Sequence, residues 1–217
     1  MQIRKSAFIK PPYLKFDFIR EKAEDFRKNH IEPIDLVPVP ITEIIEFDLK
    51  LKVITIPGML AAIDIDGFLT NDLKAICIDT DMYMNHRFEN RQRFTFAHEI
   101  GHLILHTSEI KKCRFRTPEA WKHFHEDFNK EDLDWFEQQA REFGGRLLVP
   151  VSDLESKIRA YSPKIKEYHN RTRPDKAELV KDAISRLICI DFQVSPDVIL
   201  KRIDRERLNF LFVCDHE

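Results

Sequence analysis

The chain has 217 residues and a formal net charge of −2, and 43% of its residues are hydrophobic, which is enough for a substantial core. This charge gives no overall basic field that would attract nucleic acid, which leaves only a local basic patch for such binding, and the five glycines form no GxGxxG or GxxxxGK phosphate-binding loop. The N-terminus lacks the apolar core of a signal peptide, and no run approaches the roughly 18 apolar residues of a membrane span. We therefore expect a cytoplasmic protein whose four cysteines are free thiols, with no membrane contact and no direct binding of nucleic acid.

The N-terminal part is expected to form short helices followed by a small sheet. Apolar side chains line one face of a helix over residues 17–29, and a second short helix is expected over residues 41–47. The following segments are short, rich in β-branched residues and separated by turn residues such as Pro57-Gly58. They predict a small mixed or antiparallel sheet whose strands lie within residues 51–57, 61–66 and 73–79.

Helices are expected to dominate the rest of the chain. One long helix is expected from about Arg87 to His106, an irregular segment over residues 107–130, and a second long helix from about Glu131 until Pro150 ends it. Three more helices are predicted: one from a capping box at Ser152 and Glu155, one over residues 175–190, and one from Ser195-Pro196 to about Glu206. A sheet followed by helices indicates an α+β fold, in which residues 1–150 form the core and residues 151–217 a helical C-terminal part packed on it.

The segment RFTFAHEIGHLILH, residues 93–106, concentrates its polar side chains on one narrow stripe. At about 100° per residue, the stripe from His98 to Glu99 spans about 100° of the helix, and the rest of the circumference is apolar apart from Gly101. Such a helix is buried on most sides. Because buried polar groups without partners are costly, the polar stripe is expected to face a site.

The same stripe contains the pattern H-E-x-x-H. His98 and His102 are four residues apart on one helical face, close enough to bind a single metal ion. Zinc in catalytic sites takes three protein ligands and a water, and Glu99 stands where it can accept a proton from that water. The pattern therefore favours a metal site over a pair of hydrogen-bonded core histidines.

The third ligand is expected on the second long helix, where two glutamates compete. Glu137 has apolar and small neighbours on its helical face, which predicts close packing against another helix. Glu142 falls on a face with charged neighbours, which predicts exposure to solvent. We therefore predict Glu137 as the ligand, the alternative being a surface carboxylate paired with Arg141.

Other histidines near the motif are not expected to bind the metal. His106 lies about 12 Å along the helix from His98, so it is expected to support a ligand or to lie at the edge of the core. His123 and His125 are two residues apart and do not share a helical face, so a solvated loop that could cover the cleft is the simpler interpretation.

These motifs resemble those of the ImmA/IrrE-like metallopeptidases. RQRFTFAHEIGHLILH, then EQQAREFGGRLLVP, and finally VSPDVILKRIDRERL are similar to family segments, so the likeness extends from about Phe18 to Leu208. It implies a zincin-like fold with a small sheet packed on the motif helix, zinc ligation by His98, His102 and Glu137, and Glu99 as the general base. Arg141 departs from the asparagine usual in the family, and Gly144-Gly145 replace small residues that favour helix.

The resemblance also implies a function. Members are often encoded beside a helix-turn-helix repressor, and some cleave it, so we expect a site-specific zinc endopeptidase acting on a regulator from an adjacent gene. The substrate could add a strand to residues 73–79. Manganese or iron would suit two histidines and a carboxylate as well as zinc does. The alternative is a zincin-like sensor that regulates a transcription factor by binding alone, because no residue that would stabilise the transition state is evident.

Overall fold

The computed structural model describes residues 10–112, 120–123, 129–171 and 177–212. Within these ranges the chain is mostly helical with one three-stranded sheet, so the predicted α+β fold is confirmed. None of the helices in this part of the chain has both the length and the apolar character needed to cross a membrane. Cys77 and Cys189 are buried free thiols, whereas Cys113 and Cys214 lie outside the described residues.

The elements follow one another with short connections. In chain order they are α1 (Phe16–His30), α2 (Ile41–Glu43), η1 (Ile44–Asp48), β1 (Lys52–Ile56), α3 (Met59–Ile63), β2 (Gly67–Leu69), β3 (Ala75–Asp79), α4 (Thr80–Met84), η2 (His86–Phe88), α5 (Glu89–Leu105), α6 (Thr107–Lys112), α8 (Lys130–Leu148), α9 (Val151–Ala160), α10 (Ser162–Arg171), α11 (Ala177–Phe192), α12 (Pro196–Arg205) and η3 (Leu208–Phe212).

The sheet is mixed, with strand order β1-β3-β2. β1 runs parallel to β3 with Val53 opposite Ile76, and β2 runs antiparallel to β3 with Phe68 opposite Cys77. All five residues of β3, the central strand, are buried. Among the three strands, β3 is also the closest in sequence to α5, the helix that contains the H-E-x-x-H motif.

The predicted strand over residues 61–66 is wrong, because residues 61–63 belong to helix α3 and residues 64–66 form no strand. Gly58 precedes the helix in the left-handed region (φ +69°), and the C-cap residue Asp64 also has a positive φ of 55°. The side chain of Asp79 accepts a hydrogen bond from the Leu60 backbone N–H at 2.9 Å. Ala61 and Ala62 favour helix locally, and the strand begins only at Gly67.

Two expectations for helices are also corrected. α9 begins at Val151 with Pro150 as its N-cap residue, so the predicted capping box is wrong; the Ser152 hydroxyl instead lies 3.0 Å from the Asp153 carboxylate. The segment expected to be irregular contains α6 and a helical turn over residues 120–123, while its remaining residues 113–119 and 124–128 lie outside the described part. At α12 the expected start is confirmed, with Ser195 as N-cap residue and Pro196 first in the helix.

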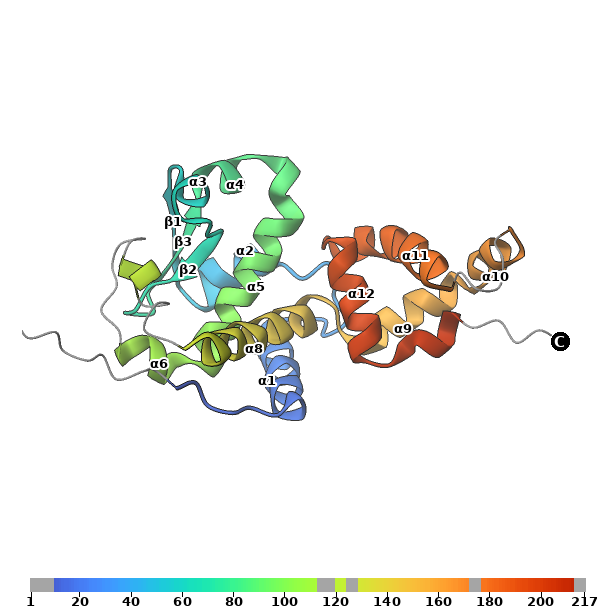
Figure 1. Cartoon of the computed structure of the whole chain (residues 1–217), viewed down its shortest axis with the longest axis horizontal. Helices are drawn as coiled ribbons and strands as arrows, with labels where there is room; N and C mark the ends of the chain where they lie inside the picture. Colours follow the sequence, from blue (N-terminus) through green and yellow to red (C-terminus); the bar gives the residue numbers. More distant parts are fainter. Residues whose placement is uncertain (1–9, 113–119, 124–128, 172–176, 213–217) are drawn as a thin grey trace, which may run out of the picture.

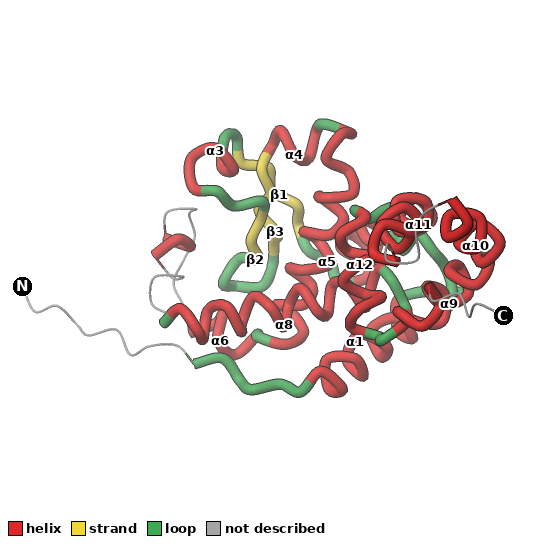
Figure 2. Tube along the Cα trace, turned by 45° about the vertical axis from the view of Figure 1, so that its right-hand side comes forward, coloured by secondary structure: helices red, strands yellow, loops and turns green. Residues whose placement is uncertain are grey.

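Helix α5 lies at the centre of the N-terminal part. It packs against the sheet through β2 on one side and along α8 on the other, and α1 covers the far side of α8. Figures 1 and 2 both show the strands on one side of α8 and α1 on the opposite side. Helices α9 to α12 gather beyond the C-terminal end of α8 (Figure 1). Helix α5 therefore lies between the sheet and α8.

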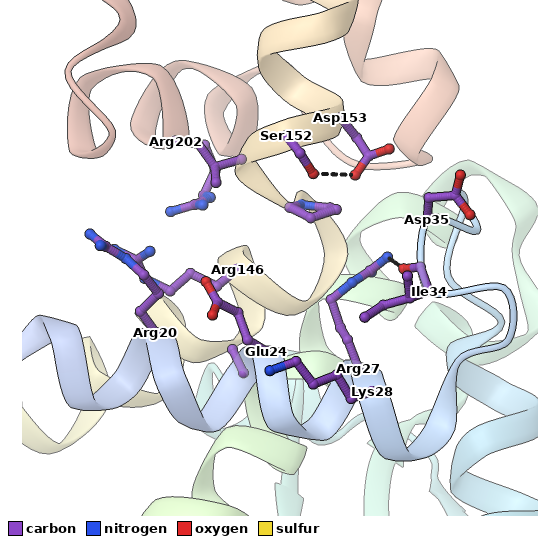
Figure 3. Close-up of a pocket in the computed structure, with 13 residues that line it drawn as sticks. Arg20, Glu24, Arg27, Lys28, Ile34, Asp35, Arg146, Ser152, Asp153 and Arg202 are labelled. Atoms are coloured by element: carbon purple, nitrogen blue, oxygen red, sulfur yellow. Dashed lines mark hydrogen bonds between the residues drawn. The ribbon is translucent and has the colours of Figure 1, made fainter.

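Arginine side chains bind the C-terminal end of α8 to α1 and to α12. Arg27 of α1 donates to the Leu147 carbonyl at 2.8 Å, and Arg202 of α12 donates to the Val149 carbonyl at 3.1 Å. Both carbonyls belong to the C-terminal end of α8, where backbone acceptors lack partners within the helix. A cavity of about 360 Å³ separates α1 from the start of α9 here, and Figure 3 shows the guanidinium groups around it.

Candidate metal centre

The structure brings His98, His102 and Glu137 together from two helices. The histidines lie one turn apart on α5, and Glu137 lies on α8, which packs along α5. Their nearest ligand atoms all fall within 4.8 Å of one another, and among the described residues this is the group able to hold a metal ion. All three side chains are largely buried, with 6–14% of their surface exposed.

The distances suit a single metal ion. His98 Nε2 lies 3.0 Å from His102 Nε2 and 3.1 Å from Glu137 Oε2, and His102 Nε2 lies 3.6 Å from Glu137 Oε1. Ligands about 2.0–2.2 Å from a tetrahedral zinc ion are separated by roughly 3.3 Å. Two imidazole nitrogens and one carboxylate also form a donor set that zinc uses in hydrolytic sites. The residues present therefore fit the metal.

The electrostatics of the three side chains follow from burial and from their mutual contacts. Burial lowers the pKa of His102 to about 3, so this imidazole is neutral near pH 7. Burial also opposes a charge on His98, but the hydrogen bond and charge of Glu137 outweigh it and raise the pKa of His98. The same histidines hold the pKa of Glu137 well below its usual range despite its burial. The site thus keeps a carboxylate and a neutral imidazole ready to act as ligands.

Glu99 lies beside the triad and is held by the edge of the sheet. Its Oε2 accepts a hydrogen bond of 2.7 Å from the Leu69 backbone N–H in β2, and its Oε1 lies 4.0 Å from His98 Nε2. Burial raises the pKa of Glu99 to about 7, and the nearby carboxylate of Glu137 adds to the shift. A carboxylate with a pKa near neutrality is well suited to taking up and releasing a proton.

Two residues beyond the triad complete its surroundings. His106 is fully buried, and its Nδ1 lies 3.0 Å from His102 Nδ1, which agrees with the supporting role expected for it. Gln139 is also fully buried and contacts His106, but the sequence analysis did not single it out. The feature of the sequence that could have identified Gln139 is its amide side chain among the apolar residues Phe136, Ala140 and Phe143 on the buried face of α8.

Glu142 does not lie on a solvent face, so this prediction is wrong. Its side chain is 9% exposed and pairs with Arg146 at 2.7 Å and with Arg205 at 3.0 Å. The adjacent carboxylate Glu206 also pairs with Arg146, at 2.6 Å, and with Arg202, at 2.8 Å. Helix α12 covers this face of α8 and supplies Arg202 and Arg205, while Arg146 comes from α8 itself, so Glu142 belongs to an ion-pair network separate from the triad.

The structure describes one of the two predicted loop histidines and both neighbours of the predicted substrate strand. His123 ends the short helical turn and is exposed, whereas His125 lies outside the described residues. The strand over residues 73–79 cannot add a substrate strand, because β3 is paired with β1 and β2 on its two edges. β2 is the edge strand nearest α5, and it also holds Glu99 through Leu69.

Two glycines allow the triad to assemble. A Cβ added at Gly101 of α5 would lie 2.8 Å from the Ala140 carbonyl oxygen, and one added at Gly144 of α8 would lie 3.1 Å from the His98 backbone nitrogen. The two backbones therefore approach more closely than side chains would permit. At Gly145 an added Cβ would meet only the flexible Arg202 side chain, at 3.3 Å.

We expect Gly144→Ala to lower zinc affinity and Gly145→Ala to preserve it. The first change pushes α8 away from His98 and so separates Glu137 from the histidines, with an overpacking cost of about 1–3 kcal/mol that a helix-propensity gain of roughly 1 kcal/mol only partly offsets. The second change gains the same propensity without the backbone clash. Zinc competition with a chromophoric chelator and thermal unfolding would measure both variants. Equal zinc affinity in the two would contradict this account of helix spacing.

Comparison with known families agrees with the fold. Residues 48–204, from the end of η1 to α12, match the model of a peptidase family described as the IrrE N-terminal-like domain. The match includes the sheet, α5 and α8, and a comparison with curated proteins gave no match. The matched region covers well over half of the chain and confirms the resemblance drawn from the motifs. This protein therefore belongs to the IrrE N-terminal-like peptidase family.

Proposed function

We propose that this protein is a zinc-dependent endopeptidase that cleaves a helix-turn-helix regulator at one or a few sites. The observation that carries the proposal is the placement of Glu99, whose Oε1 lies 4.0 Å from the ligand His98 while its Oε2 accepts a hydrogen bond from β2. A base held next to a three-ligand metal site is the arrangement of metal-assisted hydrolysis. The regulator as substrate follows from the family resemblance, and it would place the reaction in the cytoplasm.

Each residue of the site has a separate part in the proposed reaction. When bound, the metal would polarise the scissile carbonyl and acidify the attacking water. Glu99 accepts the proton from that water and then transfers it to the leaving amine. Leu69, through its backbone N–H, keeps the carboxylate of Glu99 aimed at the site during both transfers.

An open groove beside the triad supports binding of an extended polypeptide. The groove has a volume of about 800 Å³ and lies between α5, α8 and α12. Phe94, one helical turn before His98, and Arg141 both line it. Arg141, whose side chain is 60% exposed, places its Nη2 3.8 Å from Glu137 Oε2, so one residue of the groove wall contacts the third ligand. We infer that the chain to be cut enters along this groove.

The test uses the full-length protein, loaded with zinc, and the helix-turn-helix protein encoded next to it. Intact masses of the regulator are compared after incubation with the zinc-loaded protein and with protein stripped by a chelator. A discrete pair of fragments that appears only with zinc supports the proposal and locates the bond. An intact regulator that remains bound to the zinc-loaded protein would instead support regulation by association.

A further inference from the structure

A line of hydrogen bonds leads from the N-terminal segment to the ligand His102. Gln139 Nε2 donates to the Pro12 carbonyl at 2.9 Å, and Gln139 Oε1 lies 2.8 Å from His106 Nε2. His106 Nδ1 in turn lies 3.0 Å from His102 Nδ1. The line thus ends on the ring nitrogen of His102 that does not face Glu137.

The hydrogen bond between Gln139 and the Pro12 carbonyl determines which ring nitrogens of His106 and His102 carry a proton. A backbone carbonyl can only accept, so the amide nitrogen of Gln139 must face Pro12 and its oxygen must face His106. That oxygen also only accepts, so the proton of His106 must be on Nε2. In a neutral imidazole the other nitrogen then accepts, and the proton of His102 must be on Nδ1. His102 Nε2 is left with a lone pair directed at His98 and Glu137.

The surroundings keep this arrangement in place. Gln139 and His106 are fully buried, and His102 is 5% exposed, so bulk water does not compete for these hydrogen bonds. The ring of Phe136 stacks on His106 at 4.2 Å between centroids and lies 4.5 Å from His102. This apolar cover favours neutral imidazoles and fixes the planes of both rings.

We propose that Gln139 and His106 are positioning residues that hold His102 in the Nδ1–H tautomer, so that Nε2 is ready to bind the metal before the metal arrives. The assignment deepens the proposed function and rests on its metal site, but not on peptide cleavage. It also gives the N-terminal segment a role, because the Pro12 carbonyl orients the amide on which the other protons depend. Groups that orient metal-binding histidines commonly change metal affinity by about 10–100-fold when they are removed.

The test reads the tautomer directly in the metal-free, full-length protein. Long-range ¹H–¹⁵N NMR spectra of the histidine rings are expected to show His102 protonated on Nδ1 and unprotonated on Nε2. Gln139→Leu removes the acceptor at similar volume, so His102 should become a mixture of tautomers and zinc affinity should fall by about 10–100-fold. Gln138→Leu, an exposed neighbour, is the matched control for zinc affinity.

Two outcomes would overturn the inference. The first is a wild-type spectrum with the His102 proton on Nε2, which decides the matter even if a variant fails to fold. The second is an unchanged tautomer and zinc affinity in Gln139→Leu. Because these readouts need no substrate, absence of cleavage would leave this inference standing, and its failure would leave the peptidase proposal to its own test.

Discussion

Replacing Glu99 by glutamine is expected to leave zinc binding intact while cleavage of the regulator falls by about 10²–10⁴-fold, the usual contribution of a general base. Glutamine has nearly the same shape, and its amide oxygen can still accept the hydrogen bond from Leu69 N–H. It cannot accept a proton from water near neutral pH, so the step that activates the water is lost. The ligands His98, His102 and Glu137 are unaltered.

Intact-mass time courses with equal zinc loading would measure this change. Glu89→Gln removes a carboxylate from the exposed start of the same helix and is the matched control, for which the wild-type rate is expected. Cleavage by Glu99→Gln at the wild-type rate would rule out the proposed mechanism. Reduced zinc affinity in that variant would instead assign Glu99 to metal binding.

Replacing Glu137 and Glu142 of α8 by glutamine is expected to have opposite effects on zinc affinity and on stability. Glu137→Gln should lower zinc affinity by more than the 10–100-fold typical of residues that only contact a ligand, because it removes a ligand itself. Glu142→Gln should keep zinc affinity but lower the free energy of unfolding by about 3 kcal/mol, because it removes one partner of a buried ion-pair network. The remaining carboxylate Glu206 keeps this cost near the lower end of the range for buried pairs.

Zinc competition and thermal unfolding of the metal-free proteins separate the two effects. For a chain of this size, 3 kcal/mol corresponds to a Tm lower by about 6–12 °C. Glu155→Gln, in an exposed pair with Arg159 on α9, is the control and should change Tm little. A Glu142→Gln variant that loses zinc affinity but keeps its Tm would contradict the assignment of Glu142 to the ion-pair network and of Glu137 to the metal.

The sequence by itself determined the parts of this protein that depend on local periodicity. The spacing of His98 and His102 needs only the turn of one helix, and the apolar flank of Glu137 indicated a carboxylate facing another helix. The order of sheet and helices was enough for the α+β class, and two motifs were enough for the family. In each case the evidence lies within about one helix or in the order of elements.

Only the tertiary structure decided features that depend on partners distant in the chain. Glu142 looked exposed because its own helix surrounds it with charges, but Arg202 and Arg205 of α12 cover it. Residues 61–66 resembled a strand in the sequence, but residues 61–63 belong to helix α3, whose Leu60 N–H donates to the side chain of the distant Asp79. Gln139 gained its role from Pro12, 127 residues earlier. A helical wheel shows which side chains share a face, but packing decides which distant element covers that face and whether it brings apolar groups or compensating charge.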